Sequence, residues 1–194
     1  NNRIRKVTPD GIITTIAGNG EPSGGGGGTF CSRSESGENI GDGGLAADAK
    51  VTPWDICLDG AGNIYIFDIG SYRIRRINTN GIITTIAGGG DNYPDDGLIA
   101  TNAYLIHPTA MTVSKEGVVY FTDSMNQGEY FWALREIGRD GTISSILVPD
   151  VPNRCMVLES PIGLYLNDSG VIYISDGEYV RYHNIEEKNA GWMP

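Results

Sequence analysis

The chain has 194 residues, and its 40% of apolar residues are enough for a folded core and argue against disorder. A formal net charge of −10 makes a surface that repels phosphate backbones, so we expect no nucleic-acid partner. No apolar run approaches the roughly 20 residues that cross a bilayer, so we expect no membrane insertion by this segment. The 28 glycines and nine prolines indicate many tight turns between short strands.

The first predicted element is a strand pair. A basic strand over residues 3–7 precedes the octapeptide Gly-Ile-Ile-Thr-Thr-Ile-Ala-Gly at Gly11–Gly18. The octapeptide returns unchanged at Gly81–Gly88, again after a basic strand, here residues 73–77. A degenerate third copy covers residues 134–146. Such recurrence indicates a repeat architecture.

A second signature begins with glycine, continues with β-branched and aromatic residues and closes with aspartate. Its copies are Gly62–Asp68, Gly117–Asp123 and Gly170–Asp176. Another short run, each time after a proline, precedes each copy: Trp54–Leu58, Thr109–Val113 and Ile162–Leu166. Four short strands per unit predict an up-and-down antiparallel sheet. Because one such sheet cannot bury both faces alone, we predict an all-β fold of four-stranded sheets stacked radially as propeller blades.

The order of these signatures resembles the NHL type of β-propeller repeat. The pattern runs from a proline and a short inner strand, through Gly62–Asp68, to Arg-Ile-Arg at residues 73–75 and then the octapeptide. The loop Gly41–Ala49 is similar to the G-D-G-G-x-A linker of bacterial and protist NHL proteins and of teneurin-like surface proteins, and residues 95–105 hold a degenerate partner. The resemblance implies blades of four antiparallel strands, in a fold that hosts binders, scaffolds and a few enzymes.

The repeat divides the chain into one propeller segment with about three and a quarter blades. The predicted parts are a partial blade (1–18), a glycine-rich insertion and linker (19–52), a blade (53–88), a linker (89–107), a blade (108–148), a linker (149–160) and a partial blade (161–194). The last blade is predicted to end on its third strand. Since closed propellers typically need about four to eight blades, we expect the chain to be part of a longer protein or to complete its ring with a neighbouring chain.

The aspartates that close the second signature, Asp68, Asp123 and Asp176, could line a ring of carboxylates. An aspartate at the end of a strand more often accepts backbone N–H bonds in the next turn, and we favour that structural role.

The arginines of the basic strands alternate with isoleucine, so both members of each pair share one face. The pairs are Arg3 with Arg5 and Arg73 with Arg75. We expect them to lie on a solvated outer face or to pair with the neighbouring aspartates.

Loop residues offer few ligand candidates. Asp42 and Asp48 could hold Ca²⁺, but their spacing fits no established calcium loop. A turn with glycines at positive φ is the favoured interpretation of that loop. The five glycines at residues 24–28 indicate a flexible loop without the lysine of a phosphate-binding loop. We expect no cofactor.

The three cysteines make no dense disulfide framework. Cys57 lies within a strand pattern and is interpreted as a buried thiol. Cys31 and Cys155 both lie between repeats, where either a disulfide or two unpaired loop thiols would fit the sequence. Asn167 begins an N-glycosylation sequon on a predicted hairpin turn, and its occupancy requires secretion.

No catalytic constellation is evident. His107 precedes an inner strand and His183 lies in the third strand of the last blade, whereas amidating lyases of this fold place several histidines around a central metal. The leading hypothesis is therefore a non-enzymatic extracellular or cell-surface scaffold or adhesion module with protein partners. Its open blade edges suggest self-association, with a filament as the extended form. The competing hypotheses are a lyase or hydrolase with a metal in the central funnel, and a ligand-sensing propeller domain of a membrane protein.

Overall fold

The computed structural model describes residues 1–24, 39–92, 96–124, 132–147, 158–186 and 189–193. These residues form antiparallel sheets in strict chain order, which confirms the predicted all-β fold. Blade 1 is the strand pair β1 (Ile4–Val7) and β2 (Ile13–Ala17). Blade 2 consists of β3 (Pro53–Leu58), β4 (Ile64–Asp68), β5 (Arg73–Ile77) and β6 (Ile83–Gly88).

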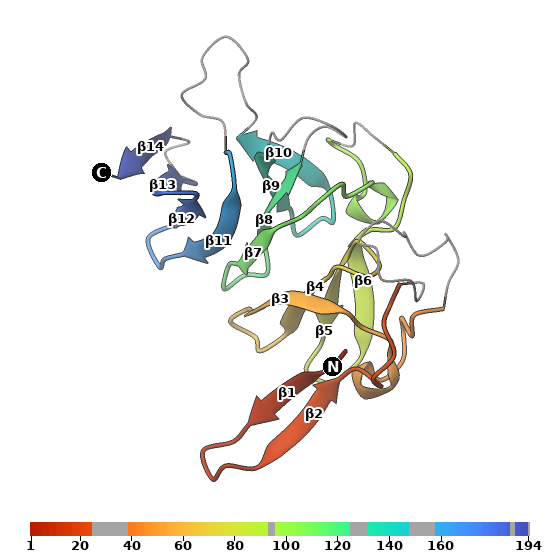
Figure 1. Ribbon diagram of the computed structural model, residues 1–194. Coiled ribbons are helices and arrows are strands. Elements are labelled where there is room, and N and C mark those ends of the chain that lie inside the picture. The colour runs from red at the N-terminus through yellow and green to blue at the C-terminus, as the bar shows by residue number, and fades with distance from the viewer. Residues whose placement is uncertain (25–38, 93–95, 125–131, 148–157, 187–188, 194) are drawn as a thin grey trace.

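Two further four-stranded sheets follow. Blade 3 consists of β7 (Ala110–Val113), β8 (Val119–Ser124), β9 (Trp132–Ile137) and β10 (Ile143–Leu147). Blade 4 consists of β11 (Pro161–Leu166), β12 (Val171–Asp176), β13 (Tyr179–Asn184) and β14 (Asn189–Met193). The blades are arranged as a fan, with β3, β7 and β11 as neighbouring inner strands and with the β1–β2 hairpin projecting at one end (Figure 1).

Strand β14 corrects the prediction that the last blade ends on its third strand. It pairs antiparallel with β13, from Val180 opposite Met193 to Asn184 opposite Asn189. Its sequence, Asn-Ala-Gly-Trp-Met, lacks the β-branched alternation of the octapeptide. The pattern could not reveal this strand because cross-strand hydrogen bonding, and not residue propensity, forms it.

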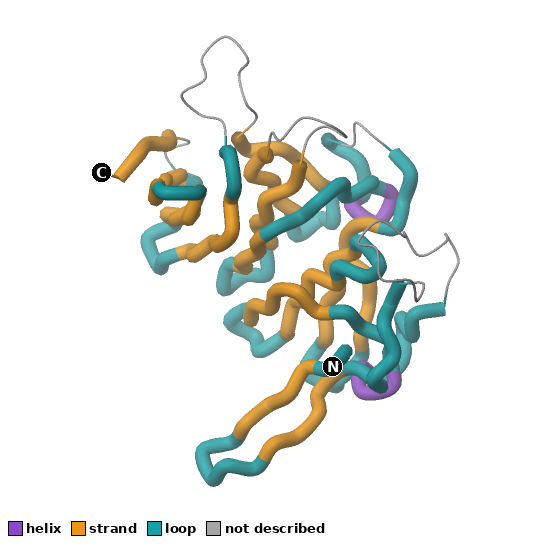
Figure 2. Tube along the Cα trace, viewed as in Figure 1, coloured by secondary structure: helices purple, strands orange, loops and turns teal. Residues whose placement is uncertain are grey.

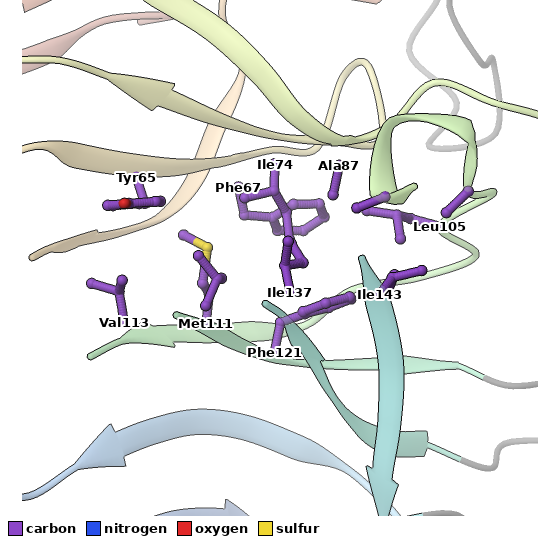
Figure 3. Packing of buried hydrophobic residues seen from close by; sticks show 13 residues of the cluster. Tyr65, Phe67, Ile74, Ala87, Leu105, Met111, Val113, Phe121, Ile137 and Ile143 are labelled. Atoms are coloured by element: carbon purple, nitrogen blue, oxygen red, sulfur yellow. The ribbon is translucent and has the colours of Figure 1, made fainter. Parts of the chain in front are cut away.

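Apolar side chains fill the spaces between neighbouring blades. Figure 3 shows Tyr65, Phe67 and Ile74 of blade 2 packed against Met111 and Phe121 of blade 3. The other two spaces repeat this arrangement, since Ile4 and Ala17 contact blade 2 and Tyr120 contacts blade 4. Blades 2 and 3 thus bury both faces through their neighbours, as radial stacking requires.

The G-D-G-G-x-A loop and its partner are short extra edges of their own blades. Gly43 donates its backbone N–H to the Ile83 carbonyl at 2.8 Å, and Ile83 donates back to Gly44 at 3.1 Å. In blade 3, Gly97 and Leu98 bond to Ile143 in the same way. A 3₁₀ turn follows in each loop, at Ala46–Asp48 and Ala100–Asn102 (purple in Figure 2). The two linkers therefore fold alike although only the first retains the full motif.

Among the described residues, no helix is long and apolar enough to cross a membrane.

Candidate functional site

The strand-closing aspartates are buried and bind the chain segment that enters their own blade. Oδ1 of Asp68 accepts the Thr52 N–H at 2.8 Å, and Oδ1 of Asp123 accepts the His107 N–H at 2.7 Å. Oδ1 of Asp176 likewise accepts the Ser160 N–H at 2.7 Å. The aspartates thus accept backbone N–H bonds, but from the segment before the inner strand and not from the next turn.

An arginine from the third strand neutralises each buried aspartate. Arg75 Nη1 lies 3.3 Å from Asp68 Oδ2, and Arg181 Nε lies 2.6 Å from Asp176 Oδ2. Arg135 Nη1 lies 3.8 Å from Asp123 Oδ2. All six residues are buried, with exposed fractions of 0 to 7%. An unpaired charge at such a depth would be very costly, so the three pairs are structural units.

Cross-strand register, and not sequence spacing, decides which arginines are equivalent. Arg75 lies opposite Ile66, and Arg181 lies opposite the matching Ile174. Arg73 instead lies opposite Asp68 itself, although Arg73 and Arg181 both follow an aspartate by five residues in the sequence. The turn between the second and third strands is shorter in blade 4, which hides the equivalence from a search by spacing.

A second carboxylate, from the linker loop, completes the unit in blades 2 and 3. Asp42 Oδ1 accepts hydrogen bonds from Arg75 Nε at 3.1 Å and from Arg75 Nη2 at 2.8 Å, while Oδ2 accepts from Thr85 Oγ1 at 2.5 Å. In blade 3, Asp96 accepts from Arg135 Nη2 at 2.9 Å and from Ser145 at 3.0 Å. We call this arrangement the Asp–Arg–Asp clamp: Asp42–Arg75–Asp68 in blade 2 and Asp96–Arg135–Asp123 in blade 3.

The clamp gives the linker aspartate a definite role. The carboxylate of Asp42 is occupied by Arg75 and Thr85, while Asp48 is exposed on the 3₁₀ turn. Gly41 and Gly43 have φ values of 91° and 83°, as the turn interpretation expects. In the described ranges, no group of three or more His, Cys, Asp or Glu side chains is placed to hold a metal ion. Calcium binding by Asp42 and Asp48 therefore remains a prediction that this geometry does not favour.

The remaining predicted sites are distributed over the molecule. Cys31 and Cys155 lie outside the described residues. Cys57 is a free, half-buried thiol, and its burial, followed by the charge of Asp55, raises its pKa to about 12. It is therefore a poor nucleophile at neutral pH. Asn167 lies on the β11–β12 turn, where its side-chain carbonyl accepts the Ser169 and Val171 N–H groups at 2.9 Å each.

The two histidines lie in different environments. His107 is exposed just before β7, whereas His183 is 3% exposed in β13. Burial lowers the pKa of His183 below its ordinary value. By cross-strand register, His183 occupies the position of Ile77 and Ile137 in the other blades. It thus replaces an apolar residue in the space between blades 3 and 4.

Blade 1 presents a clamp arginine without its partners. Arg5 occupies the position of Arg75 but is exposed, and no ion pair of its side chain is present in the part of the chain that the structure describes. Two apolar neighbours on the same face, Val7 and Ile13, are 63% and 61% exposed. Their counterparts in blade 2, Ile77 and Ile83, are 4% and 0% exposed.

Comparison with known proteins agrees with the repeat structure. Residues 23–94 match the family model described as the Teneurin NHL domain. The chain is built from NHL-type β-propeller blades. Human Teneurin-4 is 32% identical to it over 147 residues, and mouse Teneurin-4 is 31% identical over the same length. The match covers 75% of this chain but only 5% of either teneurin, so the NHL blades described here span a small part of those relatives.

Solved structures similar to these NHL blades include enzymes. A streptogramin B lyase structure has a TM-score of 0.56 at 15% identity, covering 99% of this chain and 47% of the lyase chain. A gluconolactonase from Xanthomonas campestris has a TM-score of 0.60 at 13% identity, covering 97% of this chain and 53% of its own. At these identities the likeness establishes the propeller fold alone.

The linker carboxylate is the functional group that sequence reasoning missed. The signal was nevertheless in the repeat: Asp42 and Asp96 hold equivalent places in the two linkers, as do Arg75 and Arg135 in the third strands. A polar residue at the matching place in the fourth strand, Thr85 or Ser145, completes the set. Three polar positions that recur together in an apolar repeat could have been interpreted as one contact.

Proposed function

We propose that the chain is a non-catalytic β-propeller scaffold of an extracellular or cell-surface protein, and that it acts by binding other proteins. The observation that carries this proposal is the use of the buried charge. The six charged side chains that are buried among the described residues are Asp68, Asp123, Asp176, Arg75, Arg135 and Arg181. They form three ion pairs that hold strands together, so the role of these buried charges is structural.

The similarity to the teneurin NHL domain supports the location and the class of partner. Teneurins are cell-surface proteins, and the family model that matches residues 23–94 describes their NHL domain. A propeller scaffold offers rigid blades and variable loops, which is a common basis for protein binding.

Metal analysis of the protein encoded by the complete gene tests the non-catalytic part. We expect no stoichiometric metal by inductively coupled plasma mass spectrometry after purification without chelators. One equivalent of zinc per chain would instead favour the competing lyase or hydrolase, with the metal in the central funnel.

Asn167 provides a test of the extracellular part. Its side-chain oxygen holds the hairpin turn as Asp59 and Ser114 hold theirs, and a glycan on Nδ2 leaves that oxygen available. After secretion from eukaryotic cells, we expect peptide N-glycosidase to lower the protein mass, and an Asn167→Asp variant to show no such change. A secreted protein of unmodified mass would argue against glycosylation at this turn.

Self-association through open blade edges is a further part of the proposal. Tyr165 is 65% exposed on the outer face of blade 4 and stacks on Tyr173 at 6.5 Å, and β1 has a strand partner on one edge only among the described residues. Unpaired edges favour association, and head-to-tail contacts that do not close give filaments. Negative-stain images of the native protein should show particle chains, and discrete particles at all concentrations would contradict this part.

A further inference from the structure

The molecule contains the same hairpin in two environments. β1–β2 and β5–β6 share the octapeptide and the preceding Arg-Ile-Arg, and both bury the face toward the following blade, through Ile4 and Ala17 in the first copy. The opposite face is covered in blade 2 and exposed in blade 1. The groups that cover this face in blade 2 therefore show which kind of partner would fit the exposed face of blade 1.

In blade 2 two elements meet that face. β4 pairs along β5, with Ile64 opposite Ile77 and Ile66 opposite Arg75. It ends on Asp68, which binds the guanidinium of Arg75. This pairing buries one edge of β5 and supplies one carboxylate of the clamp.

The second element is the G-D-G-G-x-A loop. It hydrogen-bonds along the start of β6 through Gly43, Gly44 and Ala46, which donates to the Gly81 carbonyl at 2.8 Å. Asp42 of the loop then bridges Arg75 and Thr85. Blade 3 repeats the arrangement with Asp96, so the same arrangement occurs twice in one chain.

Blade 1 has the matching donors for the carboxylates of such a unit. Arg5 and Thr15 stand where Arg75 and Thr85 stand, and Thr15 is half-buried. A strand pair added to the free edge of β1 would also lie over the inner strand of blade 2. There Ile56 and Leu58 are 44% and 59% exposed on the face that Ile64 and Ile66 share. These apolar side chains would add to the binding surface that Arg5 provides.

We infer that this face of blade 1 binds an acidic strand pair with an attached D-G-G-x-A loop. The outer strand of that pair ends in an aspartate beside Arg5, and the loop aspartate bridges Arg5 and Thr15. Charge complementarity supports this partner, since the β1 segment carries Arg3, Arg5 and Lys6 in a chain of net charge −10. The inference rests on the proposed protein-binding function and names the chemistry of one partner segment.

A peptide that carries the proposed partner chemistry provides the test. A fluorescein-labelled synthetic peptide with the sequence of residues 39–68 contains the loop, β3 and β4, and its anisotropy is measured against the intact chain under reducing conditions. We expect saturable binding that weakens at least about tenfold for the Arg5→Ala chain, because a charge-assisted pair is lost. The Asp42→Asn peptide should weaken by a similar factor. The Arg139→Ala chain, altered at an exposed arginine of the β9–β10 turn, should bind as the unchanged chain does.

Three results would overturn the inference. The first is no saturable binding up to about millimolar peptide, a range in which specific contacts are detectable. The second is equal affinity for the Arg5→Ala and unchanged chains. The third is self-association of the intact chain that Arg5→Ala abolishes and the peptide does not inhibit, which would assign the face to a second copy. A stoichiometric metal would contradict the proposed function whatever the peptide does, so the two failures are distinguishable.

Discussion

The octapeptide at Gly11–Gly18 and its unchanged copy at Gly81–Gly88 have the same sequence and the same hairpin backbone but different surroundings. On the face toward the next blade they agree, since Ala17 and Ala87 are both fully buried. On the other face they differ, because Ile83 is buried and Ile13 is 61% exposed. Local sequence therefore sets the hairpin, and contacts from distant parts of the chain set what each side chain contributes to stability.

The largest expected difference lies in the clamp arginine. Arg75→Ala leaves the fully buried carboxylate of Asp68 without its cation, so we expect a loss of about 3–5 kcal/mol in the free energy of unfolding. Arg5→Ala, at the same position of the exposed copy, should change it by less than about 0.5 kcal/mol. Urea denaturation followed by tryptophan fluorescence measures both. If Arg75→Ala cost as little as Arg5→Ala, the clamp would contribute little to the free energy of unfolding.

The apolar position on the same face should differ next. Ile83→Ala removes a fully buried side chain, and we expect it to cost about 2–5 kcal/mol. Ile13→Ala removes a largely exposed one and should cost less than about 0.5 kcal/mol. The same denaturation assay applies. A substantial cost for Ile13→Ala would mean that this face of blade 1 is already covered in the free protein.

The closing glycine sharpens the comparison because here the two copies should agree. Gly88 and Gly18 have φ values of 80° and 92°, and a Cβ would lie 2.3 Å from the Tyr72 carbonyl oxygen or 2.1 Å from that of Asn2. Gly81 has a similar φ of 77° with nothing within 4 Å of its Cβ position. Alanine costs about 1–2 kcal/mol at any of these left-handed positions, and the close approach adds about 1–3 kcal/mol. Melting temperatures should therefore fall more for Gly88→Ala and Gly18→Ala than for Gly81→Ala, and equal falls would contradict the close approach.

The smallest expected effect concerns His183, which stands where blades 2 and 3 have isoleucine. Burial lowers its pKa in the folded state, so the unfolded chain binds the proton more readily. Stability should consequently fall as the pH drops below about 6.5, by about 1 kcal/mol for each unit until the lowered pKa is reached. His183→Ile should remove this dependence, whereas His107→Ala, at an exposed histidine, should retain it. Unfolding free energies at pH 7.5 and 5.5 measure the difference, and an unchanged dependence in His183→Ile would assign it to other groups.

Much of the architecture could be predicted from pattern. The repeated octapeptide, the strand-closing aspartates and the prolines before the inner strands indicate four-stranded blades, and the structure confirms them. β14 could not be predicted, because its residues have no strand pattern and form a strand only by pairing with the backbone of β13. Of the clamp, the pairing of basic-strand arginines with neighbouring aspartates was one of two open alternatives, and it holds for Arg75. Its partner Asp42 lies 33 residues away, and no local pattern encodes that contact.

By itself the sequence determined which segments other than β14 become strands, where the turns between them lie and which of their residues face the same way. These properties depend on residue type and on a period of two, both of which are local. Only the tertiary structure decided that Arg75 is a buried ion-pair partner while Arg5 is exposed, and that two identical octapeptides differ in burial. Burial and charge pairing depend on what neighbouring blades and linkers place beside a side chain, and those neighbours are distant in sequence. The first hairpin carries the same octapeptide as its copy and lacks, among the described residues, the strand and loop that cover the copy.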